Sequence, residues 1–129
     1  MCTISGIITK GLGEGGHFMS MPHYQREIKK KLGFDAYPGT LNLKIGEDRE
    51  NLFKPAEAIA ITGYKSGGKT FWGASCYKAK IKNIRGAIII PEINKNPENI
   101  IEFIAPVHAK SALKVKEGDK IEIEMAKLK

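Results

Sequence analysis

The chain has 129 residues, and its 21 Lys plus Arg against 14 Asp plus Glu give a formal charge of +7 at pH 7. This length fits one domain over residues 1–129 and is too short to divide comfortably into two. The positive charge favours an anionic partner, either a nucleotide or a nucleic acid. The densest basic cluster, Lys29–Lys31, lies on the expected exposed face of a helix, where a solvated surface is the simpler interpretation.

The two cysteines, Cys2 and Cys76, lack CxxC spacing and a second pair nearby, so the sequence predicts neither a zinc site nor disulfides. We expect both to be reduced thiols. The N-terminus lacks the order of a signal peptide, and the apolar runs are far shorter than a membrane span. The sequence therefore predicts a cytoplasmic protein without membrane contact.

The first part of the chain contains a glycine cluster, Gly11–Gly16, that we expect to lie between two strands. Ile4–Thr9 is rich in β-prone residues and ends just before the cluster. His17–Ser20 has the composition of a second, short strand.

A helix is predicted over Pro22–Leu32. Proline suits the first turn of a helix, and apolar residues recur there at i, i+4 and i+8. Gly33 followed by Phe34 is typical of a glycine C-cap with its hydrophobic contact. We expect the aromatic side chains of Tyr24, Phe34 and Trp72 to lie in the core.

The rest of the chain favours a mainly β fold. Thr40–Ile45 alternates polar and apolar residues and is the clearest strand. Asn96–Ile104 fits a helix start or a strand, and we favour a strand; a short helix is predicted over Val107–Leu113. Further strands are predicted at Ala56–Thr62, Lys69–Ser75, Tyr77–Ile84, Gly86–Ile90 and Ile121–Met125. Seven or eight short strands without βαβ alternation favour a closed or nearly closed barrel over a doubly wound sheet.

Two glycine motifs match well-known nucleotide-binding patterns but lack their structural context. Gly63–Thr70 fits the Walker A pattern, yet the residues after it are aromatic and broken by glycine, so no helix can begin there. A hairpin turn is the better interpretation. Gly11, Gly13 and Gly16 fit GxGxxG, but strand-like residues follow where a Rossmann unit needs a helix.

The glycine cluster Gly11–Gly16 keeps a physical reason to bind phosphate. Glycines permit positive φ and let backbone amides approach an oxyanion closely. A glycine loop between strands can cover nucleotide phosphates, although a flexible turn explains the same residues about equally well. Backbone amides, rather than side chains, are the expected contacts.

Thr40 and Asn42 are two residues apart on the clearest strand, so both project from the face opposite Leu41 and Leu43. Hydroxyl and amide oxygens are hard ligands, and Mg²⁺ takes few protein ligands while keeping water and phosphate oxygens. A single Mg²⁺ ion could lie between them. A solvent-facing polar row on a half-buried strand explains the same pair.

Several segments, in order and spacing, resemble the archaeal CTP-dependent riboflavin kinases. They are Gly11–Gly15, Phe18, Ser20 and Tyr24, Leu32–Phe34, Tyr37–Leu43, Phe71–Gly73, Gly86–Pro91, Ile100–Pro106 and Glu117–Asp119. The resemblance covers nearly the whole chain. It implies a six-stranded cradle-loop barrel, related to RIFT barrels, with one or two short helices.

The resemblance also implies an activity and its site residues. The activity is transfer of the γ-phosphoryl of CTP to the 5′-hydroxyl of riboflavin, which gives FMN and CDP with one Mg²⁺ ion per active site. Thr40 and Asn42 match the family's metal ligands, and Asn94 and Glu102 match its flavin contacts. Its cytidine-nucleotide segments match Leu12, Gly13, Glu14, Gly15, Gly16 and His17, and then Val107, His108, Ala109 and Lys110.

Neither the residues nor the resemblance indicates a catalytic base. Glu102 could equally hydrogen-bond the flavin, and His17, His23 and His108 lack any triad-like context. His23, on the predicted helix, is expected to be a surface or packing residue. The expected partners are therefore riboflavin and CTP, with no nucleic acid and no membrane, and the expected state is a monomer. A non-enzymatic basic β-barrel that binds nucleic acid is the competing hypothesis.

Overall fold

Nine β-strands carry the fold of the computed structural model, which describes residues 2–11, 19–94 and 96–125. The strands are β1 (Cys2–Thr9), β2 (Leu41–Ile45), β3 (Ile59–Ile61), β4 (Tyr64–Ser66), β5 (Lys69–Phe71), β6 (Ala74–Ile81), β7 (Ile84–Pro91), β8 (Ile100–Ile104) and β9 (Lys120–Met125). The helices are α2 (Pro22–Leu32), α3 (Arg49–Leu52) and α4 (Ala109–Leu113), with a short 3₁₀ turn at Pro55–Glu57. Among the described helices, none is both long and apolar enough to pass through a lipid bilayer.

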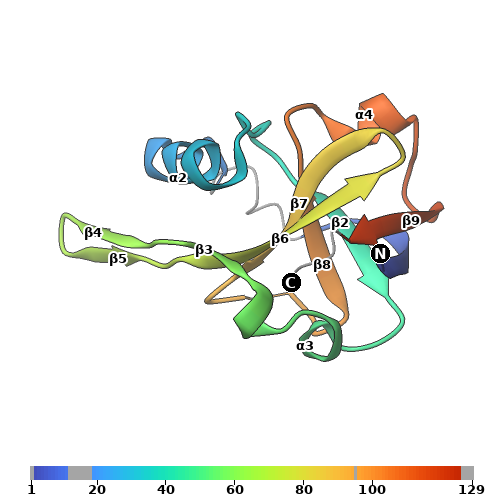
Figure 1. Cartoon of the computed structure of the whole chain (residues 1–129), viewed down its shortest axis with the longest axis horizontal. Coiled ribbons are helices and arrows are strands. Elements are labelled where there is room, and N and C mark those ends of the chain that lie inside the picture. The colour runs from blue at the N-terminus through green and yellow to red at the C-terminus, as the bar shows by residue number, and fades with distance from the viewer. Residues whose placement is uncertain (1, 12–18, 95, 126–129) are drawn as a thin grey trace.

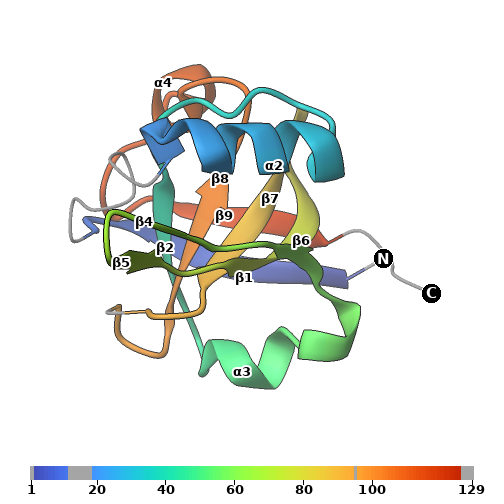
Figure 2. The same cartoon turned by 90° about the vertical axis from the view of Figure 1, so that its left-hand side faces the viewer.

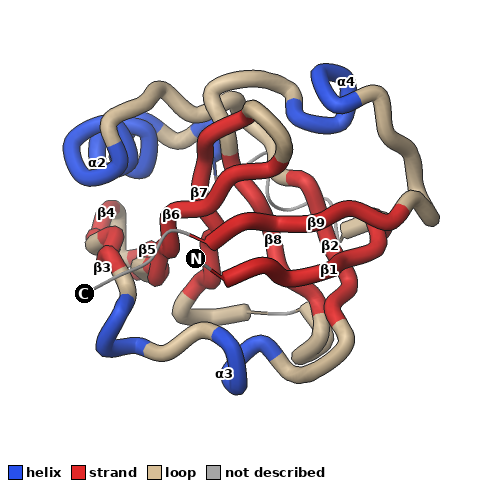
Figure 3. Tube along the Cα trace, turned by 45° about the vertical axis from the view of Figure 1, so that its right-hand side comes forward, coloured by secondary structure: helices blue, strands red, loops and turns tan. Residues whose placement is uncertain are grey.

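Six antiparallel strands form a closed barrel in the order β6, β7, β8, β2, β1, β9 (Figure 3). The ring closes between β6 and β9, where Ala79 pairs with Met125 and Lys80 with Glu124. β3 continues the sheet outside the ring by pairing with β6. The predicted six-stranded barrel is confirmed, and full closure removes exposed strand edges from the ring.

Alternating side chains of the six strands fill the barrel interior. On β2, Leu41, Leu43 and Ile45 all point inward and are at most 5% exposed. Ile81, Ile88 and Ile123, from three other strands, are completely buried in the same cluster. The period-two pattern that identified Thr40–Ile45 as a strand therefore also fixed which of its side chains face the core.

A second apolar cluster lies between helix α2 and the outer surface of the barrel. It joins Tyr24 and Ile28 of α2 to Cys76, Ile89 and Ile104 on β6, β7 and β8. Figure 2 shows α2 running across the sheet above these strands. The outer face of the barrel is thus apolar where α2 covers it, and polar groups appear only beyond the helix.

Helix α2 has the predicted bounds and the predicted caps. Pro22 occupies the first turn, and Gly33 adopts φ of 86°, with its N–H directed to the carbonyls of Ile28 and Lys29. The Tyr24 hydroxyl donates to the Trp72 carbonyl at 2.6 Å, which ties the helix to the chain before β6. His23 has the expected packing role, since its Nε2 lies 2.7 Å from the Thr62 carbonyl.

The basic cluster at the end of α2 is more structured than a solvated face. Glu27 accepts hydrogen bonds from Lys31 and from the backbone of Thr62, which together lower the pKa of Glu27 to about 2. Lys31 Nζ also donates to the Ala60 carbonyl at 2.7 Å, and Lys29 pairs with Asp35 at 3.1 Å. Only Lys30 stays on the surface without such a partner among the described residues.

The prediction of a strand over His17–Ser20 is wrong in the part that can be examined. Met19 and Ser20 are helical, whereas His17 lies outside the described residues. Met19 is completely buried, and its carbonyl accepts a hydrogen bond from Gln25 Nε2 at 2.5 Å. A short apolar run has no periodicity that separates strand from helix.

The Walker-like segment is a hairpin, as predicted. Its turn is Gly67–Gly68, with φ of 57° and 78°, between β4 and β5. Two consecutive positive φ values are typical of a two-residue hairpin turn. Figure 1 shows this hairpin projecting away from the barrel. The prediction that Trp72 belongs to the core is wrong, because the side chain is 50% exposed where the hairpin meets β6.

The remaining predictions hold with shifted boundaries. β6 begins three residues earlier than the predicted strand Tyr77–Ile84 and has the same length, whereas β7 is longer than predicted. The predicted strand Lys69–Ser75 is divided between β5 and the start of β6. β6 and β7 meet in a tight hairpin, where Ile81 pairs with Ile84. The ambiguous segment before Ile104 is the strand β8, and the short helix α4 begins two residues later than predicted. Of Ala56–Thr62 only Ile59–Ile61 is extended, and the helix α3 was not anticipated. At four residues, α3 is too short to have a periodic signature.

Candidate functional site

A polar pocket of about 360 Å³ opens on the barrel where three chain segments meet, with Glu117 from the turn before β9 added to their lining. They are the end of β1 with the two residues after it, the segment leading into β2, and the segment from β8 into α4. The polar or charged side chains that line it are Thr9, Lys10, Tyr37, Thr40, Asn42, His108, Lys110 and Glu117. The pocket has the size of a small-molecule site.

Strand pairing brings the predicted residues of this site together. Asn42 on β2 faces Thr9 on β1 on one side and Glu102 on β8 on the other. Since the neighbours of Asn42 along β2 point into the barrel, its own side chain projects outward, as predicted. The register of three strands thus places the metal-ligand candidates beside the glutamate from the other half of the chain.

A hydrogen-bond chain runs behind the pocket through the Glu102 carboxylate. Thr40 Oγ1 donates to Glu102 Oε1 at 2.8 Å, and Asn96 Nδ2 donates to Glu102 Oε2 at 3.1 Å. Glu102 is only 9% exposed. A buried carboxylate needs such donors, because leaving it without them would cost several kcal/mol. Glu102 therefore holds both neighbours in defined orientations.

The direction of the Thr40 hydrogen bond decides what its hydroxyl can do next. A hydroxyl has one hydrogen, and here that hydrogen is given to Glu102, so the oxygen lone pairs of Thr40 remain available. Threonine hydroxyl and asparagine amide oxygens are hard ligands of the kind that Mg²⁺ uses together with waters and phosphate oxygens. The donor set of Thr40 and Asn42 thus fits a magnesium ion.

The part of the chain that the structure describes has no metal site built from cysteine, histidine or carboxylate side chains. There, no three His, Cys, Asp or Glu side chains gather as a metal site would require. Cys76 is fully buried, and burial raises the pKa of its thiol to about 12, so it is neither a ligand nor a nucleophile at neutral pH.

Gly11 has a steric role at the rim of the pocket. A Cβ at this position would lie 2.4 Å from Asn42 Nδ2 and 2.6 Å from Asn42 Oδ1. A larger residue at this position would require the Asn42 side chain to move, so glycine lets the chain after β1 pass close to the Asn42 amide as it now lies. The predicted loop residues Leu12, Gly13, Glu14, Gly15, Gly16 and His17 lie outside the described residues.

The second predicted nucleotide segment forms one wall of the pocket. Val107, His108, Ala109 and Lys110 all line it. His108 Nδ1 lies 2.5 Å from Ser111 Oγ, and its ring packs against Tyr37 at 5.0 Å between centroids. The lining contains two lysines, Lys10 and Lys110, and one carboxylate, Glu117. This excess of positive charge favours an anionic ligand.

Asn94 does not line the pocket. Its Oδ1 accepts a hydrogen bond from the backbone N–H of Asn96 at 2.9 Å, and so it shapes the turn that carries Asn96 to Glu102. The sequence analysis missed Asn96 and Lys10. Lys10 could have been found from its position next to the glycine cluster, whereas nothing in the sequence distinguishes Asn96 from other polar loop residues.

Comparison with known proteins shows which family the chain belongs to. The family CTP-dep_RFKase, whose description reads "Domain of unknown function DUF120", matches residues 8–125. The chain belongs to this family. The match spans both halves of the site, from the end of β1 through β9.

Curated relatives come from several archaea and are named riboflavin kinase. One from Methanocella arvoryzae is 42% identical over 122 residues, which is 93% of this chain and 55% of the relative. One from Methanosarcina barkeri is 36% identical over 96% of this chain and 56% of the relative. One from Pyrobaculum islandicum is 38% identical over 95% of this chain and 59% of the relative. The chain thus spans a little over half the length of these relatives.

Proposed function

We propose that this protein is a riboflavin kinase that transfers the γ-phosphoryl of CTP to the 5′-hydroxyl of riboflavin, giving FMN and CDP. The observation that carries the proposal is that Thr40 and Asn42 both line the pocket, while the Thr40 hydroxyl gives its hydrogen to Glu102 and keeps its oxygen lone pairs. Membership of the family and the name of the relatives, riboflavin kinase, support the same activity, and the family name supports CTP as the donor.

In this proposal each part of the pocket has a role. Thr40 and Asn42 hold one Mg²⁺ ion, while Leu12–His17 and Val107–Lys110 hold the nucleotide. Lys10 and Lys110 add positive charge near its phosphates. Glu102 and Asn94, which do not line this pocket themselves, are the proposed flavin contacts. The proposal also retains the expectations of a single domain over residues 1–129, a monomer and a cytoplasmic location.

The reaction requires mainly positioning and charge neutralisation. The riboflavin 5′-hydroxyl oxygen forms a bond to the γ-phosphorus, the bond from that phosphorus to the β,γ-bridging oxygen breaks, and CDP leaves while the hydroxyl proton is released. Bound Mg²⁺ supplies neutralisation of the charge on the phosphate oxygens. The residues of this chain orient the two substrates and keep the reacting oxygen in line with the leaving group.

A panel of nucleoside triphosphates with riboflavin tests the proposed activity. We expect FMN, identified by product mass, to form with CTP and Mg²⁺, and CTP to give the highest rate of the four common triphosphates. Failure of all four to yield FMN would contradict the kinase proposal. Tight, salt-sensitive binding to nucleic acid without turnover would instead favour the basic binding barrel.

Glu102→Gln tests whether Glu102 acts on the metal site as well as on the flavin. In glutamine an NH₂ donor replaces one of the two carboxylate oxygens, so Thr40 and Asn96 cannot both keep the hydrogen bonds that they now donate to separate oxygens. We expect the Mg²⁺ concentration for half-maximal rate to rise by about tenfold, the low end for residues that orient a metal ligand. A Gln variant with a raised riboflavin KM and unchanged Mg²⁺ dependence would restrict Glu102 to flavin binding. Exposed Glu122→Gln on β9 is the matched control.

A further inference from the structure

A second pocket, of about 370 Å³, lies on the outer face of the barrel and shares no lining residue with the first. It is bounded by the end of α2, the β6–β7 hairpin and the end of β9. Its lining residues are Leu32, Phe34, Lys78, Ala79, Lys80, Arg85, Gly86, Glu124 and Met125. We call this second pocket the basic groove.

Cations are in excess in the basic groove. It holds Lys78, Lys80 and Arg85 against the single carboxylate of Glu124. Lys80 Nζ lies 3.7 Å from Glu124 Oε2, in a pair whose side chains are 41% and 38% exposed, so that pair is weak. Within the described residues, the side chains of Lys78 and Arg85 make neither a hydrogen bond nor an ion pair. Their charges are therefore available to a ligand.

Strand pairing keeps these charges together. Lys80 is directly opposite Arg85 in the β6–β7 ladder, and Lys78 lies two residues from Lys80 on the same outward face. Like charges directly opposite one another in a sheet repel and cost stability. An anion bound between them would relieve that repulsion, and an Arg guanidinium can hold phosphate oxygens with two parallel hydrogen bonds.

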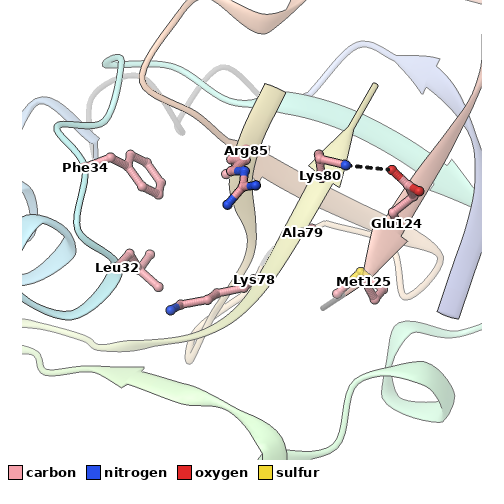
Figure 4. Close-up of a pocket in the computed structure, with 9 residues that line it drawn as sticks. Leu32, Phe34, Lys78, Ala79, Lys80, Arg85, Glu124 and Met125 are labelled. Carbon is pink, nitrogen blue, oxygen red and sulfur yellow. Dashed lines mark ion pairs between the residues drawn. The ribbon is translucent and has the colours of Figure 1, made fainter. Parts of the chain in front are cut away.

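Across the groove lies an apolar wall. Figure 4 shows Leu32 and Phe34 on one side, with Lys78 and Arg85 extending into the space before them and Lys80 turned toward Glu124. Leu32 and Phe34 belong partly to the cluster under α2, so their positions are fixed by packing. A fixed aromatic ring beside free cations suits a ligand that has both a flat ring and an anionic group.

We propose that the basic groove binds a small ligand that joins a phosphate group to an aromatic ring, the chemistry of mononucleotides. The phosphate contacts Lys78 and Arg85, and the ring packs against Leu32 and Phe34. This inference rests on the groove alone and stands whether or not the protein phosphorylates riboflavin. Binding here leaves the Thr40 pocket open, because the two sites have no residue in common.

Amide chemical shifts of the ¹⁵N-labelled full chain can separate the two pockets. Four probes are added in turn: FMN and CMP, which carry ring and phosphate; riboflavin, which lacks the phosphate; and inorganic phosphate, which lacks the ring. We expect FMN, CMP or both to cause saturable shifts around Leu32–Phe34 and Lys78–Gly86, with weaker effects from the other two probes. The difference between FMN and CMP then identifies the preferred ring.

The double variant Lys78→Ala with Arg85→Ala should weaken binding at the groove by about tenfold or more, because each lost charged hydrogen bond contributes at least this factor. Shifts around Thr40–Asn42 should persist in it. The matched control is Lys65→Ala with Lys69→Ala, which removes the same charge from the exposed β4–β5 hairpin, away from both pockets. Absence of groove shifts with FMN and CMP, equal effects of riboflavin or phosphate alone, or unchanged binding in the double variant would overturn the proposal.

Discussion

Thr40→Val is expected to weaken divalent-metal binding by about 10- to 100-fold, with a matching rise in the Mg²⁺ requirement for FMN formation. Valine keeps the shape of threonine but has no oxygen to offer a metal. The change also leaves Glu102 Oε1 without the donor it has at 2.8 Å. Mn²⁺ binding, followed by electron paramagnetic resonance without nucleotide or flavin, measures the first effect directly, and the rate at varied Mg²⁺ measures the second.

Two further variants isolate the hydroxyl as the cause. Thr40→Ser keeps the hydroxyl and should retain metal binding within a few-fold of the starting protein. Thr70→Val removes an exposed hydroxyl from β5 and should change nothing. Because losing one donor to the buried Glu102 carboxylate should lower stability, by up to about 1–3 kcal/mol, unfolding of Thr40→Val must be measured as well. Unchanged Mn²⁺ affinity in a folded Thr40→Val protein would return Thr40 and Asn42 to an ordinary polar row.

Gly86→Ala is expected to lower the free energy of unfolding by about 3 kcal/mol or more, at the upper end for overpacked positions. A Cβ on Gly86 would lie 2.0 Å from the Ile104 carbonyl oxygen and 2.8 Å from Phe103 Cζ, both on the neighbouring strand β8. The carbonyl is backbone, so β7 and β8 would have to separate. The midpoint of urea unfolding should fall without a change in slope.

Gly46→Ala is the matched control for this prediction. An added Cβ there meets no atom within 4 Å, so the same chemical change should have little effect on stability. If both variants unfold at similar urea concentrations, the close approach of β7 and β8 does not limit the residue at position 86. The sequence does not show how closely β8 approaches position 86, because that approach depends on how the strands of the barrel pack.

Local patterns predicted the elements whose signals lie within a few residues. The helix over Pro22–Leu32 has its proline, its apolar period and its glycine cap in one stretch, and its bounds are as predicted. The Walker-like hairpin was also recognisable, because the residues after it cannot start a helix. His17–Ser20 lacked such local signals. In the part that is described, Met19 and Ser20 are helical, and Met19 belongs to the apolar cluster that contains Tyr24 and Ile28 of α2.

The sequence by itself predicted a strand over Thr40–Ile45, of which Leu41–Ile45 is β2, so Thr40 lies just before it. It also predicted the outward projection of Asn42 and the likeness to a kinase family. Only the tertiary structure decided that Thr40 gives its hydrogen to Glu102, 62 residues away, and that Asn96 completes the chain of hydrogen bonds. Likewise, it alone placed Lys78 and Arg85 opposite Phe34 in the basic groove. The physical reason is that side-chain period is a local property, whereas strand register depends on how the whole barrel packs.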